Sequence, residues 1–117
     1  MINEYTRDFR AEGHDVNVVE CSIYYSKGGM NYFTGRDEGR GYYFSISPFY
    51  DSGTFRQYRG FSGAKMLVLP CDRQSKGRYQ KAKSMMDDLV ATYLDGFCGD
   101  RNIRLLSHEY EASERER

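Results

Sequence analysis

The chain has 117 residues, which is enough for one domain with one hydrophobic core. Its 17 basic and 17 acidic side chains cancel, which excludes a uniformly basic or acidic binder, and a mean hydropathy of -0.77 excludes a membrane span. The polar N-terminus predicts that no signal peptide is present, and the three widely spaced cysteines predict no disulfide framework and a cytoplasmic location.

The N-terminal part of the chain predicts an irregular segment followed by a strand. Residues 1–14 show no steady hydrophobic period, so we expect a loose lead-in there. Apolar and polar residues alternate from residue 15 to residue 27, which predicts a half-buried strand. One of its faces would carry Val19, Cys21, Ile23 and Tyr25, and the other Val18, Glu20, Ser22 and Tyr24.

Further short strands are expected before residue 70, at residues 30–34, 42–50, 54–59 and 65–69. Between the first two of these, the composition of residues 35–41 predicts a loop. A hairpin turn at residues 51–53 would lead into the third. The alternation in the second strand places on one face Tyr42, Phe44 and Ile46. Tyr43 is therefore expected on the other face, with Tyr24 as its counterpart on the earlier strand.

The period changes after residue 72, where apolar residues recur at intervals of three and four and predict one long amphipathic helix. Its apolar face would carry Tyr79, Ala82, Met86, Leu89, Tyr93 and Phe97. We expect Asp72 or Ser75 to cap its start, and Gly96 to end it in the left-handed conformation. Residues 103–106 would form a short strand or turn, and residues 108–117 a charged tail that frays.

The order of these elements predicts an α+β fold. It would be a four- to five-stranded antiparallel sheet in the order β-β-β-β-α, with one long amphipathic helix on one face. The domain is expected to span residues 15–107, between the N-terminal segment 1–14 and the C-terminal tail 108–117. The face without the helix would be open to a partner.

Aromatic and charged residues are unevenly distributed along the chain. Twelve of the 18 Tyr and Phe residues fall between Tyr24 and Phe61. The net charge is -3 over residues 1–26, +7 over residues 27–83 and -4 over residues 84–117. The neutral total therefore hides a basic, aromatic-rich middle between two acidic ends.

Few residues are of the types that carry catalysis or bind metals. The histidines, His14 and His108, lie in polar terminal segments, so we expect both to be exposed. Cys21, Cys71 and Cys98 lack metal-ligand spacing, and the first two sit in apolar strand patterns that predict buried side chains. We therefore expect a non-catalytic protein without metal or cofactor, and an enzyme is the third hypothesis.

The glycine-rich loop at residues 35–41 has two interpretations. Its backbone N–H groups, with Arg36 and Arg40, could hold a phosphate, but it is not a P-loop because no Gly-Lys-Ser/Thr and no helix follow it. Asp37 and Glu38 also oppose an anion. The favoured interpretation is a mobile hairpin loop whose glycines allow positive φ.

The predicted helix is basic in its first half and acidic in its second, the reverse of what the helix dipole prefers. This order indicates a partner, either an anion near the helix start or a second copy, or else a solvated face that tolerates a small penalty. Zero net charge also makes self-association easier, so a homodimer is considered.

Interleaved aromatic and basic residues are the sharpest functional signal. Single-stranded nucleic acid is held by rings that stack on bases and by cations that follow phosphates. The candidate stacking residues are Tyr24, Tyr32, Tyr43 and Tyr58. The candidate phosphate contacts are Lys27, Arg36, Arg40, Arg56, Arg59 and Lys65. The structural alternative is that the aromatic residues simply form strands and pair across them.

Two resemblances can be stated, the first on a run of residues and the second on the order of the elements. The run from Tyr24 to Gly35, YYSKGGMNYFTG, followed by Arg40-Gly41-Tyr42-Tyr43, resembles small uncharacterised proteins of gut Bacteroides and their phages, and that resemblance implies no activity. The order of four strands with a glycine-containing hairpin and then a helix is similar to the β4α units of the transcriptional coactivator, Whirly and PUR-repeat families. This second resemblance implies a curved sheet that holds single-stranded nucleic acid and a helix that supports a dimer.

Two functions follow from the sequence. The first is non-catalytic binding of single-stranded DNA or RNA through an aromatic and basic sheet face. The alternative is a protein-interaction module without nucleic-acid activity, such as a phage or mobile-element accessory protein that blocks or recruits a host protein. Exposed Tyr and Arg side chains would then anchor the interface. No membrane partner is expected in either case.

Overall fold

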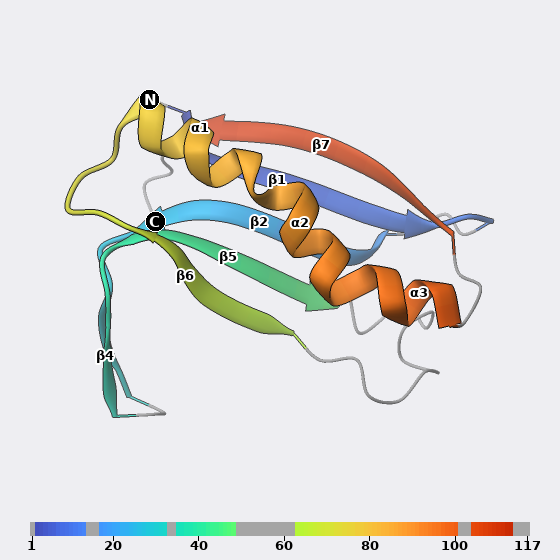
Figure 1. The fold of residues 1–117 in the computed structure, drawn as a ribbon, viewed down its shortest axis with the longest axis horizontal. Coiled ribbons are helices and arrows are strands. Elements are labelled where there is room, and N and C mark those ends of the chain that lie inside the picture. Colours follow the sequence, from blue (N-terminus) through green and yellow to red (C-terminus); the bar gives the residue numbers. More distant parts are fainter. Residues whose placement is uncertain (1, 14–16, 33–34, 49–62, 101–103, 114–117) are drawn as a thin grey trace.

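The computed structural model describes residues 2–13, 17–32, 35–48, 63–100 and 104–113. Within these ranges five strands form one antiparallel sheet in the order β6-β5-β2-β1-β7 (Figure 1). They are β1 (Ile2–Ala11), β2 (Asn17–Ser26), β5 (Gly41–Pro48), β6 (Ala64–Pro70) and β7 (Leu105–Ser113). A smaller sheet pairs β3 (Gly29–Asn31) with β4 (Arg36–Glu38). The fold is α+β.

One long helix lies across one face of the five-stranded sheet (Figure 1). Its segments are α1 (Lys76–Ser84), α2 (Met86–Val90), the π-helical turn η1 (Ala91–Asp95) and α3 (Gly96–Asp100). The prediction that Ser75 caps the helix is confirmed, because its Oγ accepts a hydrogen bond from the backbone N–H of Arg78 at 3.1 Å. The prediction for Gly96 is wrong, since its φ of -62° is helical. The apolar stripe continues past the glycine through the buried side chains of Leu94 and Cys98.

The hydrophobic core lies between the sheet and the helix. The middle strands contribute the buried side chains of Val19, Cys21, Ile23, Tyr42, Phe44 and Ile46. The helix contributes those of Tyr79, Ala82, Met86, Val90 and Leu94. The predicted buried faces of both strands are therefore confirmed. Each large apolar side chain in this layer contributes roughly 1.5–3 kcal/mol by burial, which holds the helix against the sheet.

The two ends of the chain differ from the prediction. Residues 2–11, expected to be loose, form β1, and β7 includes residues expected to lie in a fraying tail. The reason is that charged side chains interrupt the apolar faces of these strands and find partners on other elements. Arg7 of β1 faces the helix, where its Nη1 lies 2.8 Å from Asp87 Oδ1. Its Nε also lies 3.1 Å from Glu109 Oε1 on β7.

The reversed charge order of the helix also has partners within the chain. Lys83 Nζ lies 3.0 Å from Glu111 Oε1 on β7, and the hydroxyl of Tyr79 donates a hydrogen bond to Glu111 Oε2 at 2.5 Å. These two hydrogen bonds lower the pKa of Glu111. Asp87, in the acidic half, meets Arg7 of β1. The sheet therefore supplies an opposite charge for both halves of the helix.

The strands β3 and β4 form a hairpin that extends away from the main sheet (Figure 1). Residues 35–41, predicted to be a loop, thus contain a short strand. Gly28 lies at the base of this hairpin with a φ of 73°, and a Cβ there would collide with the carbonyl oxygen of Glu38. The base therefore requires glycine. The predicted turn at residues 51–53 and strand at residues 54–59 lie outside the described residues.

Candidate functional site

The structure divides the predicted binding residues into three groups. Tyr24, Tyr43 and Lys65 lie together on the far face, which we define as the sheet face opposite the helix. The hairpin region carries Lys27, Tyr32, Arg36 and Arg40. Outside the described residues lie Arg56, Tyr58 and Arg59.

An aromatic pair with a cation over it forms the first group. Tyr24 and Tyr43 are register partners on β2 and β5, as predicted, and their rings stack with centroids 6.0 Å apart at 19°. Lys65 Nζ lies 5.0 Å from the Tyr43 ring centroid and 3.2 Å from Glu38 Oε2. Burial disfavours the charge on Lys65, but the hydrogen bond to Glu38 and the nearby tyrosines outweigh it, so its pKa is raised. The cation is therefore already engaged within the protein.

Tyr43 is not available to stack on a base. Its side chain is only 4% exposed, and its hydroxyl donates a hydrogen bond to the carbonyl oxygen of Gly39. Burial raises the pKa of its hydroxyl. The expectation that Tyr43 offers its ring to a ligand is therefore corrected. The ring faces away from the helix as predicted, but Tyr24 and Lys65 pack over it.

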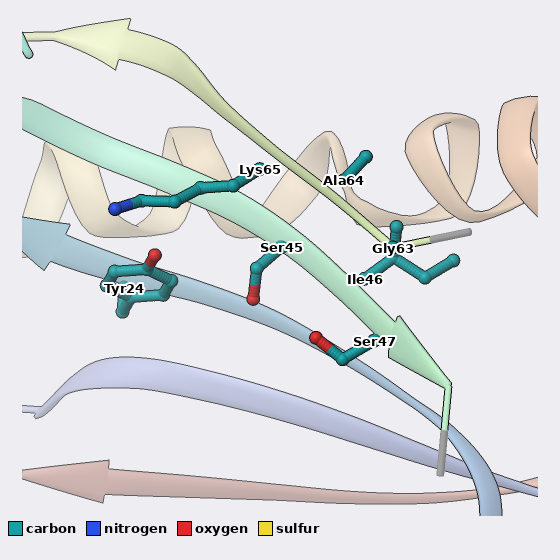
Figure 2. Close-up of a pocket in the computed structure, with 7 residues that line it drawn as sticks. All are labelled: Tyr24, Ser45, Ile46, Ser47, Gly63, Ala64 and Lys65. Carbon is teal, nitrogen blue, oxygen red and sulfur yellow. The ribbon is translucent and has the colours of Figure 1, made fainter. Parts of the chain in front are cut away.

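A shallow pocket of about 490 Å³ lies beside this pair. Figure 2 shows Tyr24, Ser45, Ser47 and Lys65 directed to the same side of the sheet, with the helix behind it. Three of these four side chains carry hydroxyl groups, so the pocket offers hydrogen bonds, and the cation beside it, Lys65, is paired with Glu38.

Carboxylates share the far face, and the sequence reasoning did not identify them as part of it. Glu20 on β2 stands opposite Asp8 on β1, and Glu4 stands opposite Tyr24. Burial, followed by the charges of Asp8 and Glu4, raises the pKa of Glu20. Burial also raises the pKa of Asp8. The grouping was missed because β1 was expected to be irregular, and these carboxylates make the middle of the far face unfavourable for phosphate.

The hairpin and its two flanks project from the main sheet, and we call their described residues, 27–32 and 35–40, the arm. Its aromatic residue, Tyr32, is 92% exposed, and Met30 is 55% exposed. Cationic side chains are exposed at both ends, and Arg40 Nε donates a hydrogen bond to the carbonyl of Lys27 at 3.5 Å. None of the arm's described side chains is buried. The arm therefore presents an exposed ring and three cations, the third being Arg36 on β4. β4 also carries two carboxylates, of which Glu38 pairs with Lys65 and Asp37 is exposed.

The predictions for cysteine and histidine are only partly confirmed. Cys21 is buried, and burial raises the pKa of its thiol to about 12, so it is not a reactive thiolate at neutral pH. Cys71, expected to be buried, is only partly so because it follows the end of the edge strand β6. His108 is exposed on β7, and His14 lies outside the described residues. In the described ranges no three His, Cys, Asp or Glu side chains are grouped to hold a metal ion.

Among the helical segments that the structure describes, none has the length and apolar character needed to cross a membrane. Comparison with protein-family models, with curated proteins and with solved structures finds no match to this chain.

Proposed function

We propose that this chain is a non-catalytic protein that binds single-stranded nucleic acid, and that the arm makes the main contact. The observation that carries the proposal is the 92% exposed ring of Tyr32 on a two-stranded ribbon that also carries Lys27, Arg36 and Arg40. An exposed ring can stack on a base, and cations around it can follow the phosphates. Packing against the core does not explain this combination, since no described side chain of the arm is buried.

Charge on the far face supports an arm-centred contact. Glu4, Asp8 and Glu20 lie on the middle strands, whereas the arm extends beyond them (Figure 1). A phosphate chain that followed the sheet would meet these carboxylates, whereas one that followed the arm would meet Lys27 and Arg40 at its base. Tyr24, beside the pocket, can then take a further base from a strand that leaves the arm.

The test is fluorescence anisotropy of a labelled oligothymidine at two or more salt concentrations. If the three cations of the arm each neutralise one phosphate, log K should fall with log salt at a slope of about -2. Changing Lys27, Arg36 and Arg40 together to Gln should remove most of the binding and the slope. The matched control replaces by Gln three exposed cations near the helix start, Arg73, Lys76 and Lys81. Equal loss in both variants, or no binding at low salt, would refute the proposal.

A second candidate function is a protein-interaction module, and the exposure of Met30 favours it. Met30 and Tyr32 are 55% and 92% exposed on the same arm, and apolar residues of this kind anchor protein interfaces. A complex anchored in this way should depend little on salt. Capture of a host protein that persists at high salt and is lost in Met30→Ala, with no oligonucleotide binding, would favour this function over the first.

A further inference from the structure

We infer that the outer edge of β7 pairs with β7 of a second copy of this chain, in an antiparallel register that joins the two sheets. β7 is the last strand of the five-stranded order, with β1 on its inner side. In the part of the chain that the structure describes, no strand pairs with its outer side. Such an edge presents backbone N–H and C=O groups ready to pair with another strand.

The two edges of the sheet differ in how well they are guarded. β6, at the opposite edge, ends at Pro70 and has a register shift against β5 between Tyr42 and Tyr43. Proline and irregular pairing are devices that block edge-to-edge association. β7 has no proline in its nine positions, LLSHEYEAS, and its register shift against β1 lies at the end of the pairing, between Ile2 and Glu4. Of the two edges, β7 is therefore the better suited to extend the sheet.

The acidic residues of β7 do not guard its edge either. Glu109 and Glu111 point to the helix side, where they meet Arg7 and Lys83. Their charges are therefore already balanced within the chain. On the far face the strand instead exposes two large apolar side chains, Leu106 at 40% and Tyr110 at 38%.

The sequence of β7 is self-complementary in one register, which is why we commit to a second copy as the partner. When His108 of each chain meets His108 of the other, Leu106 of one chain stands opposite Tyr110 of the other, and this pair occurs twice. On the helix side Glu109 then faces Ser107, so no acidic residue faces another. Moving the centre one residue toward the C-terminus would place Glu109 opposite Glu109, which is unfavourable. Moving it one residue toward the N-terminus would place Leu106 opposite His108, so both Leu106–Tyr110 pairs would be lost. The zero net charge of the chain does not oppose association.

The test is sedimentation equilibrium of the full chain from micromolar to millimolar concentration. We expect a reversible dimer whose Kd rises about tenfold or more in Leu106→Glu, because each dimer loses two apolar pairs. In Leu106→Glu/Tyr110→Lys the introduced charges face each other across the interface, and dimerisation should recover. Within one chain the two positions are about 13 Å apart along the strand, so the recovery cannot come from contact inside a subunit.

The matched control is Leu106→Glu/Ala112→Lys, which would recover only in the neighbouring register. Folding is checked by thermal melting, and both introduced charges suit the monomer, since Leu106 stands beside Arg10 and Tyr110 lies near Asp8. Should Leu106→Glu fail to fold, Tyr110→Lys alone should weaken the dimer in its place. A monomer at all concentrations, an unchanged Kd in the single variants, or recovery with Ala112→Lys instead of Tyr110→Lys would overturn the inference.

Discussion

Tyr32 and Tyr43 are both stacking candidates in the sequence, but their replacement by Ala should have opposite effects on binding and on stability. Tyr32 is 92% exposed on the arm, whereas Tyr43 is 4% exposed within the far face. Tyr32→Ala should lower affinity for a single-stranded oligonucleotide by about 1–3 kcal/mol, the contribution of one base stacked on a ring. The Kd should therefore rise about 5- to 140-fold. The free energy of unfolding should change by no more than about 0.5 kcal/mol, because no packing is lost.

Tyr43→Ala should show the reverse pattern. Removing a buried aromatic side chain costs about 3–5 kcal/mol of folding free energy. With an unfolding entropy of about 2.1 cal/mol/K per residue, this corresponds to a fall in Tm of about 12–20 °C for 117 residues. Tyr43→Phe is the matched control, since it keeps the ring and loses only the hydrogen bond to the Gly39 carbonyl, worth about 1 kcal/mol.

Both variants are measured by thermal melting and by anisotropy below their melting temperatures. Affinity unchanged in Tyr32→Ala would mean that the arm does not carry the binding. Loss of oligonucleotide affinity in Tyr43→Phe, with only a small change in Tm, would indicate that the binding site lies on the far face. Either result would refute the division of roles between the two tyrosines.

Three further variants test the N-cap of the helix, the base of the arm and the loss of folding stability at acidic pH. Ser75→Ala removes the N-cap and should cost about 1 kcal/mol, or about 4 °C in Tm; an unchanged melt would contradict the cap. Gly28→Ala should disrupt the arm, because Gly28 has a φ of 73° and an added Cβ would collide with the carbonyl oxygen of Glu38. The expected result is a change in amide NMR shifts confined to residues of the arm, and unchanged shifts in the arm would contradict the predicted strain. Tyr79 and Lys83 lower the pKa of Glu111, so that stabilisation is present above the unfolded pKa and is lost as pH falls through the folded one. Glu111→Gln should therefore flatten the acidic decline of the urea midpoint, and a decline as steep as in the parent would count against it.

Hydrophobic alternation predicted the middle of the sheet because nothing interrupts it there. Alternate residues are apolar and buried from Val19 to Ile23 on β2 and from Tyr42 to Ile46 on β5. The register partners Tyr24 and Tyr43 therefore followed from the pattern alone. The first half of the helix was equally clear, since Tyr79, Ala82 and Met86 are buried as predicted. Further along, Leu89 and Tyr93 are only partly buried, and Val90 and Leu94 lie in the core instead. In these elements local pattern and tertiary packing agree.

The edge of the sheet was not predictable by the same reasoning. Arg7 stands where the apolar face of β1 should continue, and β7 carries Glu109 and Glu111 on the corresponding face. The strands accommodate these charges because each has an ionic partner nearby in space: Arg7 pairs with Glu109, and Lys83 pairs with Glu111. Sequence periodicity does not record partners that lie far apart along the chain, so both segments looked like irregular termini. Without β1, the carboxylates of the far face could not be grouped either.

The arm separates the basic residues from this acidic surface, and that separation affects how binding depends on salt. The three residues of β3 span about 10 Å, similar to the Debye length of about 8 Å at physiological ionic strength. A phosphate held near Tyr32 is then largely screened from Glu4, Asp8 and Glu20, while one held near the base of the arm is not. At low salt the screening weakens and the carboxylates repel the nucleic acid more strongly. The slope of log K against log salt should consequently be shallower than the slope expected from the three cations alone. The difference between the two slopes would indicate how far along the arm the phosphates lie.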